Sequence, residues 1–112
     1  MKQARVTKNH APVHEQVLIA RAGEMLHLER VDDEWPGWIW CVDGSGIGSW
    51  VPDAYLVIDG RIARLLVDYE ATELTVQPGD LLILQHEVNG WWWAADSRGE
   101  EGWVPEKKLD LV

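Results

Sequence analysis

The chain repeats itself, and this repeat constrains the fold more than any other feature of the sequence. Residues 36–56, PGWIWCVDGSGIGSWVPDAYL, are echoed 53 positions later by residues 89–109, NGWWWAADSRGEEGWVPEKKL. Upstream, AGEMLHLERV at 22–31 is echoed by PGDLLILQHE at 78–87, and the three-residue change of offset falls in one loop. Loops absorb length changes at little cost. The pattern therefore indicates a duplicated domain, with boundaries expected at residues 1–58 and 62–112.

Each repeat has the pattern of short β-strands. Apolar runs at 25–31 and 81–85 follow a glycine and an acidic residue, and aromatic-rich runs at 38–42 and 91–95 precede loops of Asp, Gly and Ser. Pro52 and Pro105 lack an N–H group and should end the strand before them. No stretch has a sustained helical period, so the expected fold class is all-β with at most single helical turns.

These motifs resemble a known family. Residues 65–109 resemble a Src-homology 3 (SH3) domain through Asp68-Tyr69, Glu73-Leu74-Thr75, Gly79-Asp80, Trp91-Trp92 and Gly102-Trp103-Val104-Pro105. The first repeat is more divergent and resembles bacterial variant SH3 domains that carry a GWIWC strand and a WVP ending. The resemblance implies two tandem SH3-like small β-barrels.

The resemblance also implies a ligand and a groove. SH3 domains commonly bind extended polyproline II segments on an aromatic groove, and an acidic loop orients a basic residue of the ligand. The positions that match the groove are Tyr69, Glu73, Trp91 and Pro105 in the second repeat, and Trp38, Pro52 and Tyr55 in the first.

Several groove positions depart from the family pattern. Val67 and Lys108 stand where the family usually has tyrosines in the second repeat. In the first repeat, Lys8 and His10 replace the two tyrosines of the first strand, and Val17 stands where Glu73 stands in the second. An acidic group at residues 32–34 lies just before the Trp35–Trp38 turn. Neither repeat keeps the complete groove.

Two further tryptophans have no family counterpart. Strand alternation places Trp40 and Trp93 on the same face as Trp38 and Trp91. Large aromatic residues there suggest an interface between the repeats, an extended binding surface, or additional packing against a neighbouring strand. The linker between the repeats, residues 57–64, is half apolar and is not a flexible Gly/Ser tether. We therefore expect the two barrels to be packed together, in a monomer or a domain-exchanged dimer.

Composition excludes several classes of function. Nineteen acidic against ten basic residues give a formal charge of -9, which argues against nucleic acid and anionic membranes as partners. A single cysteine, Cys41, excludes an intramolecular disulfide and every multi-cysteine metal pattern. A proline separates His10 from His14, which disfavours a metal site. We expect no metal, no cofactor, no catalytic residues and a cytoplasmic location.

The sequence thus predicts a non-enzymatic module that binds an extended, proline-containing and basic segment of a partner protein. Two alternatives stay open. One is attachment to bacterial cell-wall peptidoglycan, and the other is a regulatory subunit that binds a folded partner through tryptophan-rich faces.

Overall fold

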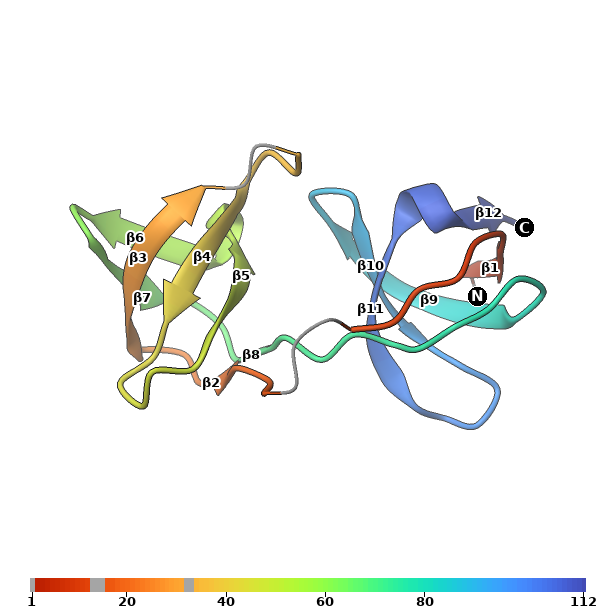
Figure 1. Cartoon of the computed structure of the whole chain (residues 1–112), viewed down its shortest axis with the longest axis horizontal. Helices are drawn as coiled ribbons and strands as arrows, with labels where there is room; N and C mark the ends of the chain where they lie inside the picture. Colours follow the sequence, from red (N-terminus) through yellow and green to blue (C-terminus); the bar gives the residue numbers. More distant parts are fainter. Residues whose placement is uncertain (1, 13–15, 32–33) are drawn as a thin grey trace. The chain divides into compact units, whose positions relative to one another are not determined.

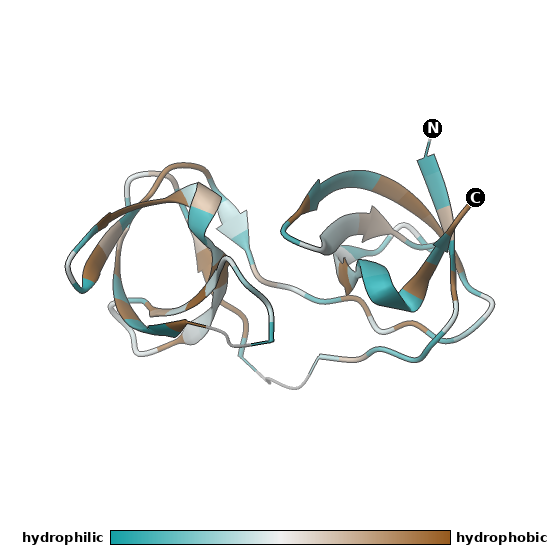
Figure 2. Ribbon diagram, turned by 90° about the horizontal axis from the view of Figure 1, so that it is seen from above, coloured by the Kyte–Doolittle hydropathy of each residue, from teal (hydrophilic) through white to brown (hydrophobic). Residues whose placement is uncertain are grey.

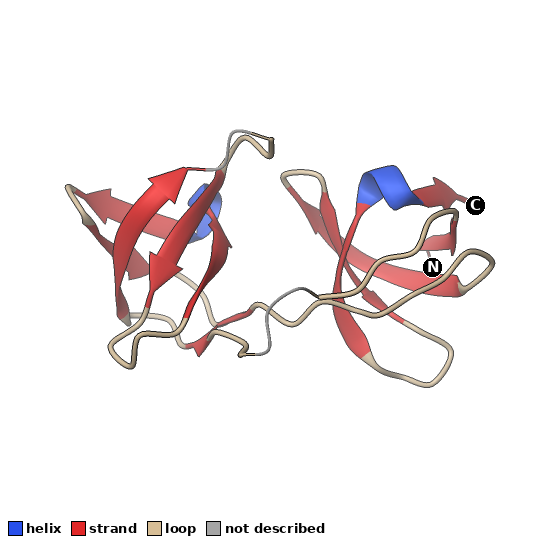
Figure 3. Cartoon of the chain, viewed as in Figure 1, coloured by secondary structure: helices blue, strands red, loops and turns tan. Residues whose placement is uncertain are grey.

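The computed structural model describes residues 2–12, 16–31 and 34–112. These residues form two five-stranded antiparallel sheets and a two-stranded ribbon. Their helical structure is limited to two 3-10 turns of three residues each, η1 (Asp53–Tyr55) and η2 (Glu106–Lys108), drawn in blue in Figure 3. The all-β expectation is confirmed.

The chain divides into two compact units. One consists of two separate segments, residues 1–15 and 72–112, and is called here the split unit. The other is the single segment 16–71. It is called the permuted unit, for a reason given by its strand order below.

The sheet of the split unit has the strand order β11-β10-β9-β1-β12. In Figure 1 the red N-terminal strand β1 lies among the cyan and blue strands of the C-terminal half. The strands are β1 (Lys2–Val6), β9 (Leu81–Val88), β10 (Trp91–Ala95), β11 (Glu101–Pro105) and β12 (Leu109–Leu111).

The sheet of the permuted unit has the corresponding order β5-β4-β3-β7-β6. Viewed from above in Figure 2, the strands of this unit curve around a closed interior. They are β3 (Met25–Val31), β4 (Trp38–Val42), β5 (Gly48–Pro52), β6 (Leu56–Asp59) and β7 (Ile62–Leu65), with the ribbon β2 (Ile19–Ala20) and β8 (Tyr69–Glu70).

Each sheet takes the fourth strand in its order from the other repeat. Strand β1 comes from the first repeat and pairs with β9 and β12 of the second, whereas β7 comes from the second repeat and pairs with β3 and β6 of the first. Two matched backbone hydrogen bonds repeat this arrangement: Gly23 N–H donates to Leu65 C=O, and Gly79 N–H donates to Val6 C=O. The repeats have therefore exchanged their first strands within one chain.

The turn between the repeats explains the exchange. Asp59 pairs with Ile62, so only Gly60 and Arg61 connect β6 to β7. Gly60 has a φ of 64° whereas Arg61 is not among the residues with positive φ, the pattern of a two-residue type II′ hairpin. A two-residue turn leaves β7 no route but the antiparallel position beside β6. That is the place a first strand occupies in each sheet, so β1 completes the remaining sheet.

The compact units are therefore divided differently from the predicted boundaries at residues 1–58 and 62–112. Residues 56–59 and 62–65 are paired strands rather than a linker, and the chain passes between the units near residue 15 and at residues 71–72. The permuted unit is a circular permutant, in which the last strand of the first repeat runs directly into the first strand of the second. The split unit keeps the ordinary strand order and carries the permuted unit as an insertion.

Buried side chains agree with this assignment. Ala4 and Val6 of β1 are 0% and 2% exposed and belong to a core cluster with Leu82 and Leu84 of β9. In β7, Ala63 and Leu65 are each 1% exposed. The exchanged strands thus contribute core side chains rather than edge contacts.

Strand ends and faces follow the sequence pattern. β5 ends at Pro52 and β11 ends at Pro105, as the missing N–H predicts. Along β4, Ile39 and Cys41 are buried while Trp40 between them is half-buried, as strand alternation predicts. Trp38, at the start of the strand, is buried as well.

Candidate functional site

The exchange brings two tyrosines from different repeats together in the permuted unit. Tyr55 at the end of η1 and Tyr69 in β8 have ring centroids 5.8 Å apart with an interplanar angle of 70°, an edge-to-face pair. The Tyr69 hydroxyl donates a hydrogen bond of 2.9 Å to the carbonyl of Trp50 in β5. Tyr69 is 4% exposed, and its bond fixes it against the neighbouring strand.

Trp38 and Pro52 complete this set. They face each other across the β4–β5 ladder, and residue 37 accepts the N–H of Asp53, which positions the η1 turn that carries Tyr55. Trp38 is only 4% exposed, whereas Tyr55 is half-buried. Burial raises the pKa of the Tyr55 hydroxyl. We call Trp38, Pro52, Tyr55 and Tyr69 the composite groove.

The corresponding place in the split unit has different chemistry. His10, which stands where Tyr69 stands, lies edge-on to Trp91 at 5.5 Å between ring centroids. Its Nε2 is 2.6 Å from a Glu73 carboxylate oxygen, and its Nδ1 is 2.9 Å from the Lys108 ammonium nitrogen. Since Lys108 can only donate, Nδ1 accepts and Nε2–H donates to Glu73. A polar network replaces the aromatic groove here.

Two of the predicted groupings need correction. Tyr69 lies in the permuted unit, where its ring contacts Tyr55, because β8 follows the exchanged strand β7. Trp91 and Pro105 instead pair across β10 and β11 in the split unit. Glu73 does lie in the split unit, but its carboxylate is engaged by His10 rather than turned to a ligand. The acid expected to receive a basic residue is therefore not part of the composite groove.

The exchange also explains how one unit has both groove tyrosines although each repeat has only one of them. The first repeat keeps Tyr55 but has His10 in its first strand segment, and the second keeps Tyr69 but has Lys108 in its 3-10 turn. Exchange collects both tyrosines in the permuted unit, and both replacements in the split unit. Sequence reasoning missed this sorting because it compared each repeat only with itself.

A second aromatic cluster lies on the outer face of β4 and β5. Trp40 and Trp50 face each other across the ladder, with ring centroids 5.2 Å apart at 78°. The Arg30 guanidinium carbon lies 5.0 Å from the Trp40 ring and 5.4 Å from the Trp50 ring. In the split unit, Trp93 and Trp103 form the same pair at 5.4 Å, with His86 at 5.5 Å from Trp103.

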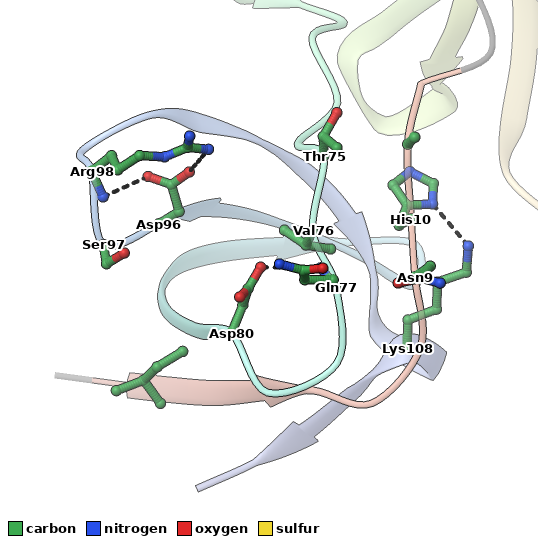
Figure 4. Close-up of a pocket in the computed structure, with 12 residues that line it drawn as sticks. Asn9, His10, Thr75, Val76, Gln77, Asp80, Asp96, Ser97, Arg98 and Lys108 are labelled. Carbon is green, nitrogen blue, oxygen red and sulfur yellow. Dashed lines mark hydrogen bonds and ion pairs between the residues drawn. The ribbon is translucent and has the colours of Figure 1, made fainter.

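The split unit also contains a cavity of about 600 Å³ (Figure 4). Residues 9–11, 75–77 and 96–98 line it, with Lys108 at one end. Two carboxylates that line the cavity accept backbone hydrogen bonds within the adjacent turns. Asp80 accepts the N–H of Gln77, and Asp96 accepts the N–H groups of Arg98 and Glu100. The sequence offered no signal for this cavity, because its walls come from both ends of the chain.

Comparison with known proteins supports the fold and the type of domain. The variant SH3 domain model matches residues 60–112. A 53-residue alignment is 36% identical to the Myosin ID heavy chain of Dictyostelium discoideum, and it covers 45% of this chain but only 5% of that protein. No solved structure matches the chain. SH3 domains are interaction modules without catalytic chemistry of their own.

The matched segment and the structural units do not coincide. The match begins at Gly60 and includes β7 and β8, which belong to the permuted unit. A family segment that is continuous in sequence is therefore shared between two units in space.

Metal-ligating clusters and membrane-spanning helices are absent from the part of the chain that the structure describes. No group of three or more His, Cys, Asp or Glu side chains could hold a metal ion there, and no described helix is long and apolar enough to cross a membrane. The sequence disfavours a metal site at His10 and His14, and His14 lies outside the described residues. Asp32 and Asp33 of the acidic group also lie outside them.

Proposed function

We propose that this chain is a non-enzymatic protein-interaction module and that its principal ligand site is the composite groove. The ligand is an extended, proline-containing and basic segment of a partner protein. The observation that carries this proposal is the contact between Tyr55 and Tyr69, two groove aromatics that reach one site only through strand exchange.

The physical basis is the fit between proline and flat aromatic rings. A polyproline II segment is extended before it binds, so docking costs little conformational entropy. Tyr55 offers a partly exposed ring that contacts Tyr69, and this ring is carried by the η1 turn that begins directly after Pro52. In the split unit the same position carries Lys108, which His10 holds. This contrast favours the composite groove over its counterpart.

The charge of the permuted unit supports a basic ligand. Residues 16–71 contain ten acidic and four basic residues, a formal charge of -6, whereas residues 1–15 and 72–112 contain nine acidic and six basic, a formal charge of -3. A negative surface speeds the encounter with a positive segment and sets its orientation. The preference for basic ligands comes from this overall charge, since Glu73 is occupied.

A cytoplasmic location is part of the proposal. The chain has one cysteine, and Cys41 is a free, buried thiol, which agrees with a reducing compartment.

The experiment is a titration of the full chain with a proline-rich peptide flanked by arginines, followed by the indole N–H signals of the tryptophans. Tyr55→Ala removes an aromatic anchor and should weaken binding about thirtyfold, the effect of roughly 2 kcal/mol at a hot spot. Lys108→Ala is the matched control at the equivalent position of the split unit, and it should leave binding unchanged.

Two results would reject the composite groove. One is a loss of binding in Lys108→Ala with Tyr55→Ala unaffected. The other is a response to soluble peptidoglycan fragments but none to the peptide, which would favour the cell-wall alternative.

A further inference from the structure

Three side chains of the split unit, those of Glu73, His10 and Lys108, form a continuous chain of hydrogen bonds that the proposed function does not use. His10 Nε2–H donates to the Glu73 carboxylate at 2.6 Å. The Lys108 ammonium donates to His10 Nδ1 at 2.9 Å (Figure 4). The His10 side chain is only 9% exposed, so both ring nitrogens are occupied and the ring has little contact with water.

The network joins the two separate segments of the split unit. His10 belongs to residues 1–15, and its two partners belong to residues 72–112. The His10 N–H donates to the Val76 carbonyl at 3.0 Å, and the Val76 N–H donates to the His10 carbonyl at 2.9 Å. Lys108 lies in η2, and its carbonyl accepts the N–H of Thr7. The backbones that carry the imidazole and the ammonium are therefore fixed across the same two segments.

Glu73 is positioned by a close approach of two backbones. It forms an isolated bridge with Trp103 in β11. A Cβ atom at Gly102 would lie 2.8 Å from the Leu74 nitrogen and 3.0 Å from the Glu73 carbonyl carbon. Glycine at position 102 thus allows this segment to pack directly on β11. The carboxylate that accepts from the imidazole is therefore held in place by the fold.

The observed network requires a neutral imidazole. An ammonium group can only donate, so His10 Nδ1 must keep its lone pair to accept from Lys108. A proton added at Nδ1 removes this acceptor and brings a second positive charge to a nitrogen 2.9 Å from the ammonium nitrogen. The bond to Glu73 is kept, because Nε2–H still donates and the pair becomes charge-assisted. Protonation therefore breaks one of the two bonds and strengthens the other.

The charged groups around the network leave Lys108 free to move. Among the described residues, its ammonium forms no ion pair with a carboxylate. The other charged side chains that line the same cavity are Asp80, Asp96 and Arg98. Asp96 pairs with Arg98, and Asp80 accepts a backbone N–H within its own turn. A released ammonium can turn into this cavity, where these two carboxylates lie.

We infer that His10 is a proton-operated latch in the split unit. Neutral His10 holds the Lys108 ammonium, whereas protonated His10 releases it and stays on Glu73. Histidine is the side chain whose charge changes between pH 5 and 8, so a modest change of pH is the signal that operates such a latch. The imidazole also lies edge-on to the half-buried Trp91 at 5.5 Å, so the change reaches the aromatic surface of this unit.

The permuted unit has no such latch. Tyr69 stands where His10 stands and Tyr55 stands where Lys108 stands, and these two side chains meet ring to ring. Tyrosine hydroxyls stay neutral throughout the range in which histidine changes charge. Acidification should therefore alter the split unit and leave the composite groove unchanged.

The test is a pH titration of the full chain from pH 8 to pH 5, followed by nuclear magnetic resonance. It records the His10 ring nitrogens, the Lys108 side chain and the Trp91 indole N–H. At pH 8 the His10 ring should be the Nε2–H tautomer. As His10 gains its proton, the Lys108 and Trp91 signals should shift with the same midpoint. His86 lies edge-on to Trp103 and is the control histidine, whose own charge change should leave Lys108 unmoved.

Two variants separate the latch from a passive contact. His10→Gln keeps a donor and an acceptor but cannot titrate, and it should abolish the pH response of Lys108 and Trp91. Lys108→Met removes the second cation, so the midpoint of the His10 charge change should move to higher pH.

The inference is overturned if His10 is the Nδ1–H tautomer at pH 8, or if it gains no proton down to pH 5. It is also overturned if His10 gains its proton with no change at Lys108, or if Lys108 responds equally in His10→Gln. The tautomer and the shared midpoint are read on the wild type, so they decide the question even where a variant fails to fold. None of these outcomes bears on the Tyr55 titration.

Discussion

At the scale of single residues, Tyr69 shows how one side chain depends on the exchange. Its ring contacts Tyr55 and its hydroxyl bonds to the Trp50 carbonyl, and both partners belong to the first repeat. Tyr69→Phe removes the hydrogen bond but keeps the ring. The free energy of unfolding should fall by about 1 kcal/mol, measured by urea denaturation. Tyr55→Phe is the control, and an equal loss in both variants would contradict the assigned bond.

Cys41 gives a prediction at the same scale. The side chain is 0% exposed, and burial raises the pKa of its thiol to about 12. The thiolate is the reactive form, so native protein at pH 8 should react with a thiol reagent far more slowly than unfolded protein does. Because the folded pKa lies above the unfolded value, the thiol's contribution to stability is present below about pH 9 and is lost as the pH rises toward 12. Rapid labelling of the native chain at pH 8 would show that β4 is not packed as described.

Most residues of the composite groove could be predicted from the sequence, but not which of them lie in the same unit. Trp38, Pro52 and Tyr55 were predicted together and lie in one unit, because they follow one another within a single hairpin and turn. Tyr69 was assigned to the wrong group because its position depends on long-range pairing. The signal that could have placed Tyr69 correctly is the length of the connection between Asp59 and Ile62. Two residues are the length of the commonest β-hairpin turns.

At the scale of elements, the sequence predicted which residues form strands but not which strands pair. Alternation and proline positions are local, and they gave β4 and β10 with the observed bounds. Pairing depends on the turn at Gly60, which the sequence repeat places within the expected linker at residues 57–64. The duplicated sequence makes β1 and β7 candidates for the same position, so the turn decides between them.

The turn can be tested by substitution. Gly60 has a φ of 64° and open space around its Cα, so Gly60→Ala meets no clash and its cost is purely conformational. That cost should be about 1–2 kcal/mol of unfolding free energy. Gly44 also lies in open space but has no positive φ, and Gly44→Ala should leave the stability unchanged or raise it by up to about 1 kcal/mol. Thermal denaturation of the two variants measures the difference, and equal stability would argue against a strained turn at Gly60.

At the scale of the whole molecule, the exchange changes which fragment is a domain. Residues 16–71 contain every strand of the permuted unit in one continuous segment, whereas residues 1–58 lack β7. Expressed alone, residues 16–71 should fold cooperatively and melt at a higher temperature than residues 1–58, because they keep the native β6–β7 hairpin. Circular dichroism melts of the two fragments compare them directly. A higher melting temperature for residues 1–58 would favour two unexchanged domains.

The most direct test of the account is the strand pairing of the intact chain in solution, observed through interstrand nuclear Overhauser effects. Exchange predicts contacts between the backbones of Leu26 and Ala63, and between those of Ala4 and Leu82. Contacts of β3 with β1, and of β9 with β7, would instead show that each repeat keeps its own first strand, and the composite groove would not exist.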